Sequence, residues 1–146
     1  MIDLDNQTNL SIDIVKLEKI ANSLTLKDIE LIVTDENTMQ ELNNIHRGKN
    51  FSTDVLSFPL DMPSKEDHSF CMPLGSIVIS HKHIIDKSKE LKHTPQNELS
   101  LLFIHGVLHL LGFDHETDNA EMRLKEKELI EKFNLPQSLI IRTEES

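Results

Sequence analysis

The spacing of apolar and polar residues divides much of the chain into alternating strands and helices. Three short segments rich in β-branched residues predict strands: Asp28–Thr34, Thr53–Leu60 and Leu74–Ser80. Four segments with apolar residues at helical spacing predict amphipathic helices: Val15–Ser23, Glu36–Ile45, Ile84–Lys92 and Asn119–Phe133. Because the two kinds of element alternate, the residues alone predict an α/β or α+β fold.

A fifth predicted helix is the most apolar part of the chain. Thr94 and Pro95 supply the N-cap and the first-turn proline, and Gly112 is placed to end the helix. Between Leu99 and Leu111 only four residues are not apolar: Ser100, His105, Gly106 and His109. A helix that is apolar nearly all round is expected to be the central, buried one.

Length and composition indicate one globular domain spanning residues 1–146. The chain has 146 residues, of which 38% are hydrophobic and 27% charged, and no linker or internal repeat is visible. Its one cysteine, Cys71, and the lack of a basic-then-apolar N-terminal pattern lead us to expect a cytoplasmic protein. The longest apolar run, Leu101–Ile104, is far shorter than the roughly 20 residues of a membrane span, so no membrane partner is expected.

The charge is unevenly distributed along the chain. The net charge is −10, but residues 46–93 carry 7 basic and 6 acidic groups and are nearly neutral. This middle part contains Arg47, Lys49 and a lysine cluster: Lys82, Lys87, Lys89 and Lys92. A local basic surface for a polyanion therefore remains compatible with an acidic chain, although the lysines also fit an ordinary solvated helix face.

The sequence HGVLHLLGFDH, residues 105–115, predicts a metal site. His105 and His109 are four residues apart and therefore lie on one face of the helix, and a turn after Gly112 can bring His115 to the same side. A lone histidine on an apolar helix is usually a core residue, but three at this spacing can hold one divalent ion with an open position, as in catalytic zinc sites. Gly106 costs about 1 kcal/mol against alanine in a helix interior, which suggests a close backbone neighbour.

The same spacing occurs in the metzincin protease motif, H-E-x-x-H-x-x-G-x-x-H, with one departure. Gly106 occupies the position of the glutamate that serves those proteases as general base, and no neighbouring residue in the helix can replace it. Proteolysis is therefore disfavoured. Hydrolysis of another bond remains possible, because a metal ion can itself acidify a water molecule and polarise a phosphoryl oxygen.

HGVLHLLGFDH resembles the signature of the YbeY family of bacterial rRNA-maturation endoribonucleases. LNNIHRGKNFSTDVLSFP, residues 42–59, and LGSIVIS, residues 74–80, are similar to two further segments of that family. The resemblance implies an α+β fold in which helices, here the five predicted ones, pack around a mixed four-stranded sheet. It also implies that His105, His109 and His115 bind one zinc ion and that Arg47 lies at the catalytic cleft. Ser76 departs from the aspartate that the family often has there.

The implied activity is metal-dependent cleavage of single-stranded RNA during maturation of small-subunit (16S) rRNA and ribosome quality control. In this interpretation His105 and Arg47 are catalytic, and the Arg47 guanidinium stabilises charge at phosphorus. The implied partners are rRNA and the small ribosomal subunit or its precursor, with an Era-type GTPase or ribosomal proteins as further candidates. A non-catalytic, zinc-stabilised ribosome assembly factor is the alternative, and a metalloprotease is less favoured.

Several other polar residues have weaker functional interpretations. Asp54 fits either a turn or cap contact or a hydrogen bond to a histidine or Arg47, and Asp114 is the better candidate for orienting a histidine. Ser57 could contact substrate, although a strand hydroxyl is usually structural. The remaining histidines are given no role: His46, His68, His81, His83 and His93. Phenylalanine, with six copies, is the only aromatic type, so no broad base-stacking platform is expected.

Overall fold

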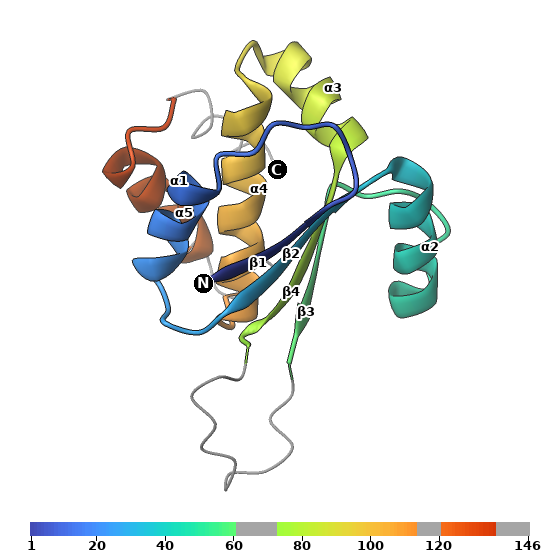
Figure 1. Cartoon of the computed structure of the whole chain (residues 1–146), viewed down its shortest axis with the longest axis horizontal. Helices are drawn as coiled ribbons and strands as arrows, with labels where there is room; N and C mark the ends of the chain where they lie inside the picture. Colours follow the sequence, from blue (N-terminus) through green and yellow to red (C-terminus); the bar gives the residue numbers. More distant parts are fainter. Residues whose placement is uncertain (61–72, 114–120, 137–146) are drawn as a thin grey trace, which may run out of the picture.

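The computed structural model describes residues 1–60, 73–113 and 121–136 of the chain (Figure 1). The described strands are β1 (Ile2–Asn6), β2 (Ile29–Thr34), β3 (Val55–Pro59) and β4 (Gly75–Ser80). The described helices are α1 (Ile14–Asn22), α2 (Glu36–Arg47), α3 (His81–Leu91), α4 (Pro95–Leu110) and α5 (Glu121–Lys132). This confirms the predicted mixed four-stranded sheet with five helices.

The strands form one sheet in the order β1-β2-β4-β3. β1, β2 and β4 run parallel to one another, whereas β3 runs antiparallel to β4 and lies at the edge. The residue pattern did not predict β1, in which acidic residues separate the apolar ones and only Ile2 is buried. A strand at the edge of a sheet with one covered face has few apolar positions, so its signal is weak.

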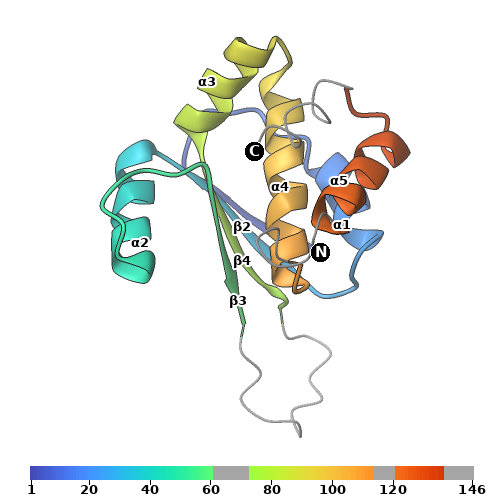
Figure 2. The ribbon, with the colours of Figure 1, turned by 180° about the vertical axis from the view of Figure 1, so that it is seen from behind.

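The helices cover the two faces of the sheet unequally (Figures 1 and 2). The main core joins apolar side chains of α1, α4 and α5 to those of β1, β2 and β4 on one face. On the other face, α2 packs through Met39 against Leu56 of β3 and Val78 of β4. β3 therefore lies between α2 on one side of the sheet and α4 on the other.

Local contacts define both ends of α4 as the sequence predicts. The Thr94 hydroxyl accepts a hydrogen bond from the Asn97 N–H at 3.1 Å, and Pro95 is the first helical residue. At the other end Gly112 has φ +99°, and the Phe113 N–H donates to the Leu108 carbonyl at 3.0 Å. This reversal is the glycine-dependent C-terminal motif of many helices. Most of α4 is buried, which confirms its central place.

The start of α2 is fixed by Asp35, whose carboxylate accepts a hydrogen bond from the Thr38 N–H at 2.7 Å. This backbone hydrogen bond lowers the pKa of the exposed Asp35 carboxyl group, because it stabilises the charged form. At its other end α2 carries Arg47, so the cap helps to set the position of the arginine.

Gly106 lets α4 lie directly against β4. A Cβ atom at Gly106 would lie 2.9 Å from Cγ2 of Ile77 and 3.0 Å from its Cδ1. The sequence predicted a close backbone neighbour here, but the neighbour is the Ile77 side chain. The absence of a side chain thus serves helix–sheet packing, and this packing offsets the helix-propensity cost of glycine.

Some predictions fall outside the described residues: the roles of Asp114 and His115, and the first two residues, 119 and 120, of the predicted helix Asn119–Phe133. Within the described ranges, no helix is both long and apolar enough to cross a bilayer.

We expect Gly106→Ala to lower the free energy of unfolding by about 1–3 kcal/mol, because overpacking against the stiff Ile77 outweighs the gain in helix propensity. Urea unfolding in the presence of a chelator measures this effect without any contribution from metal. The control is the same substitution in an Ile77→Ala background, where the added methyl group should no longer destabilise. A higher urea midpoint for the single variant Gly106→Ala would contradict the packing argument.

Candidate active site

A cleft of about 680 Å³ crosses β3 between the C-terminal parts of α2 and α4. His46 and Arg47 of α2 line one side, and His105 and His109 of α4 line the other. The segment 53–59, which contains β3, lies between them (Figure 2). The cleft therefore brings together three residues that the sequence predicted for the site, Arg47 and the two helical histidines, and adds His46.

The floor of the cleft is the open edge of the sheet. The Asp54 carbonyl accepts from the Ser80 N–H at 2.9 Å, and the Leu60 N–H donates to the Leu74 carbonyl at 3.2 Å. In an antiparallel pair alternate residues point their backbone groups inward, so those of Val55, Ser57 and Pro59 point away from β4. Backbone groups of the floor are thus turned toward the open side of the strand.

The two imidazoles on α4 meet through their Nε2 atoms, which are 3.1 Å apart. The other ring nitrogens face oxygen atoms: His109 Nδ1 lies 3.0 Å from the Phe113 carbonyl and His105 Nδ1 lies 2.8 Å from Glu126 Oε1. A carbonyl oxygen only accepts hydrogen bonds, so His109 carries its hydrogen on Nδ1. The Glu126 carboxylate favours the same tautomer at His105, which makes Nε2 the ring nitrogen through which each imidazole can bind an ion.

This donor set fits a divalent metal ion. Neutral imidazoles bind metals through one ring nitrogen while the other donates to a carboxylate or carbonyl oxygen, which is the pattern of His105 and His109. His105 is 27% exposed, so an ion can reach it from the cleft. The third predicted ligand, His115, lies outside the described residues. The described part of the chain contains no group of three or more potential metal-binding side chains.

Glu126 of α5 is a site residue that the sequence analysis missed. It is 4% exposed, and its carboxylate fixes the orientation of the His105 ring. A buried glutamate in an otherwise apolar helix face is a detectable signal, since Met122 and Leu129 on the same face are buried. Its partner is 21 residues away in the sequence, however, and only the folded chain identifies it.

Arg47 is positioned by a neutral partner. Its Nη1 donates to Asn43 Oδ1 at 3.5 Å, and Asn43, which is fully buried, donates through Nδ2 to the Phe51 carbonyl at 2.8 Å. No carboxylate among the described residues forms an ion pair with Arg47. The surface ion pair expected of an ordinary arginine is therefore absent within the described chain, and the positive charge faces the cleft.

Of the weaker candidates, Asp54 and Ser57 line the cleft and Ser76 does not. The Asp54 carboxylate accepts a hydrogen bond from the Val55 N–H at 2.8 Å, a local contact at the start of β3, and Asp54 also lines the cleft. Ser57 lines the cleft and donates to the Gly106 carbonyl at 3.3 Å. Ser76 instead donates to Glu30 of the neighbouring strand at 2.8 Å and does not line the cleft.

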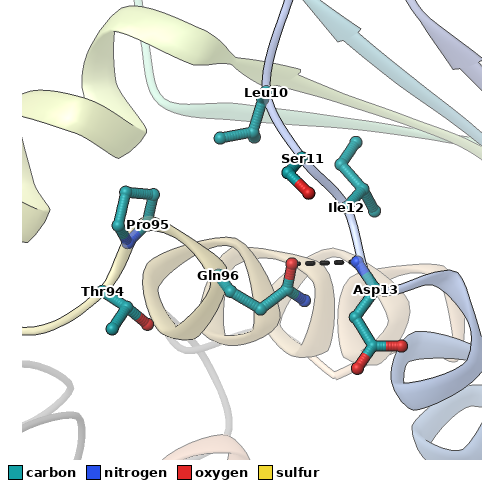
Figure 3. A pocket seen from close by; sticks show the side chains of 7 residues that line it. All are labelled: Leu10, Ser11, Ile12, Asp13, Thr94, Pro95 and Gln96. Carbon is teal, nitrogen blue, oxygen red and sulfur yellow. Dashed lines mark hydrogen bonds between the residues drawn. The ribbon is translucent and has the colours of Figure 1, made fainter.

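A second cavity, of about 410 Å³, lies near the start of α4 (Figure 3). The Gln96 side-chain oxygen accepts a hydrogen bond from the Asp13 N–H at 3.0 Å, which ties the segment before α1 to α4. None of the predicted site residues lines this cavity. Of these two cavities, only the cleft across β3 is lined by predicted site residues within the described ranges.

The described chain is thus an α+β protein whose cleft brings an arginine and two histidines together. Comparison with known proteins shows which family it is. Residues 2–134 match the family described as Endoribonuclease YbeY, and the chain belongs to this family.

Individual relatives agree with this assignment. An Endoribonuclease YbeY from Sulfurovum sp. is 58% identical over 144 residues, covering 99% of this chain and 98% of the relative. One from Nautilia profundicola is 56% identical over 146 residues, covering 99% and 100% of the two chains. The solution structure of TM1509 from Thermotoga maritima has a TM-score of 0.62 and 29% identity, covering 91% of this chain and 89% of the other. The similarity thus extends to both sequence and fold.

Proposed function

We propose that the protein is a metal-dependent endoribonuclease that cleaves single-stranded RNA during maturation of small-subunit rRNA. The observation that carries this proposal is the cleft, in which two converging imidazole Nε2 atoms and an arginine line opposite sides. Membership of the Endoribonuclease YbeY family supports the reaction and the class of substrate. The proposed partners are the precursor of the small ribosomal subunit and its RNA, in the cytoplasm.

His105 and His109 would hold the metal ion, with His115 as the proposed third ligand. When bound, a divalent ion would supply positive charge at the scissile phosphate and acidity to a water molecule. Glu126 would keep the His105 ring in the orientation that presents Nε2. We propose zinc, because three histidines with an open position are a catalytic zinc arrangement.

Arg47 would bind the phosphate and stabilise the charge that develops on it. A guanidinium is always charged and can form two parallel hydrogen bonds to phosphate oxygens. Asn43 holds the Arg47 side chain through a neutral amide, which does not offset the positive charge of the guanidinium as a carboxylate would. A preorganised charge in a fixed position contributes to catalysis because it needs no reorganisation during the reaction.

The peptidase alternative is weakened further by the packing of α4. The position of the protease glutamate is Gly106, where even a Cβ atom would lie 2.9 Å from Ile77. This site therefore has no room for the general base of the metzincin mechanism. The assembly-factor alternative predicts RNA binding without cleavage. The RNA cleavage rates measured below therefore distinguish it from the proposed endoribonuclease.

We expect the purified protein to hold about one zinc ion per chain and His109→Ala to lose it, since two imidazoles rarely hold a metal as three do. Elemental analysis measures the metal. Chelation should lower the melting temperature of the parent protein, because a ligand bound only by the folded state stabilises it. His81→Ala, which changes a histidine outside the cleft, is the control and should retain zinc. Full zinc retention in His109→Ala would overturn the assignment.

Replacing Arg47 with glutamate should lower the cleavage rate by about 100-fold or more, the scale seen when one preorganised electrostatic group is removed. Zinc content and folding should remain unchanged, because Arg47 lies on α2 and is not one of the proposed ligands. The measurement is single-turnover cleavage of a precursor rRNA fragment at saturating protein. Lys49→Glu makes the same charge change two residues away, outside the cleft lining, and should retain most of the activity. Cleavage by Arg47→Glu at the parent rate would disprove this role.

RNA affinity should fall as salt rises from about 50 to 200 mM, despite the net charge of −10, because contact is made through local cations. The slope of log affinity against log salt should be shallow, reflecting few phosphate contacts. Filter binding of an unpaired RNA measures it, and Arg47→Glu should flatten the slope further. An affinity that does not change with salt would argue against a phosphate contact.

A further inference from the structure

Two rings meet on the Arg47 side of the cleft. His46, from the last turn of α2, and Phe58, from β3, have ring centroids 4.8 Å apart and planes inclined at 57°. Both residues line the cleft that also contains Arg47 and the imidazole pair. The inclination shows that the two rings are not stacked face to face.

We propose that His46 and Phe58 form a subsite that stacks on an unpaired nucleobase next to the phosphate bound by Arg47. This inference rests on the proposed function, because it takes RNA as the substrate. It gives a binding role to His46, which the sequence analysis left without one. It adds one local base contact to a chain in which the sequence predicts no broad base-stacking platform.

Packing in the core accounts for the position of the Phe58 ring but not for that of the His46 ring. Phe58 is half-buried and packs against the small core of Met39, Leu56 and Val78, so part of its ring is structural. His46 is exposed, its ring packs against that of Phe58, and no described residue forms a hydrogen bond or ion pair with it. No hydrogen bond or ion pair with a described residue therefore explains why the His46 ring lies at the cleft.

Adjacency to Arg47 makes a nucleobase the fitting occupant. In RNA each base is joined to its phosphate through a single ribose, so a phosphate held by Arg47 brings its base close to the neighbouring side chains. Every base presents a π-face, and stacking on aromatic side chains does not depend on base identity.

Such a subsite would favour unpaired RNA. Bases inside a duplex are stacked on both faces by their neighbours and cannot lie on a protein ring without being extruded. A subsite that requires an open base face therefore selects loops and single strands. The cleft volume of about 680 Å³ lies within the range of about 300–1,000 Å³ found for small-molecule sites, so it has room for one nucleotide.

The test is an equilibrium titration of fluorescent RNA with the protein as purified, followed by anisotropy. The probe is a short unpaired RNA that a gel shows to remain intact, together with versions carrying one abasic residue at successive positions. For the parent protein, the abasic residue should weaken binding by about tenfold at one position, within the range measured for loss of one stacked base. Annealing the probe to its complement should weaken binding at least as much.

Variants of His46 and Phe58 test whether these two rings contact the base at the sensitive RNA position. His46→Ala should bind the intact probe about tenfold more weakly and should no longer distinguish the abasic RNA. His46→Phe should restore the discrimination, and His81→Ala, a histidine outside the cleft, should match the parent. Phe58→Leu keeps an apolar side chain in the small core but removes the ring, so it should weaken binding of the intact probe in the same direction.

Equal abasic penalties in the parent and in His46→Ala would overturn the subsite, even if the parent cleaves RNA normally. If binding distinguishes abasic from intact RNA only when His46 is present, but the parent protein does not cleave RNA, the subsite is supported and the proposed endoribonuclease function is wrong. No RNA binding by the parent at any salt concentration would overturn both.

Discussion

The close approach of α4 to β4 at Gly106 sets where the two imidazoles of α4 lie in the cleft. Because Gly106 has no side chain, α4 lies directly against β4, and the Ser57 hydroxyl of β3 reaches the Gly106 carbonyl at 3.3 Å. His105 and His109 are carried on the same turns of α4 and so lie beside the sheet edge. A larger residue at position 106 would move the imidazoles away from Arg47, which belongs to the opposite face of the sheet.

The parts of the structure that the sequence predicted are those set by neighbours along the chain. Thr94, Pro95 and Gly112 mark the ends of α4 through bonds to residues no more than five positions away. The joint placement of His105 and His109 follows from helical geometry alone. Arg47 came from the family resemblance, and its position opposite the imidazoles depends on the packing of α2, which local patterns do not encode.

The parts that were missed depend on contacts across the fold. Glu126 reaches His105 from another helix, and β1 acquires its register only by pairing with β2. Asn43 did leave a signal, since it follows the buried Met39 by four residues and places an amide on the apolar face of α2. A polar residue at a core position often indicates a structural or positioning role, and here the amide anchors both the following loop and Arg47.

The place of β3 at the edge of the sheet also bears on solubility. An open edge strand offers unpaired backbone groups to any other extended chain, and proteins commonly shield such edges to prevent aggregation. Here α2 and α4 lie on the two sides of β3, and Pro59, at its end, has no N–H to offer. The walls that shape the cleft thus also hinder another strand from joining the sheet. Substitutions that widen the cleft for a larger substrate would expose this edge and favour self-association.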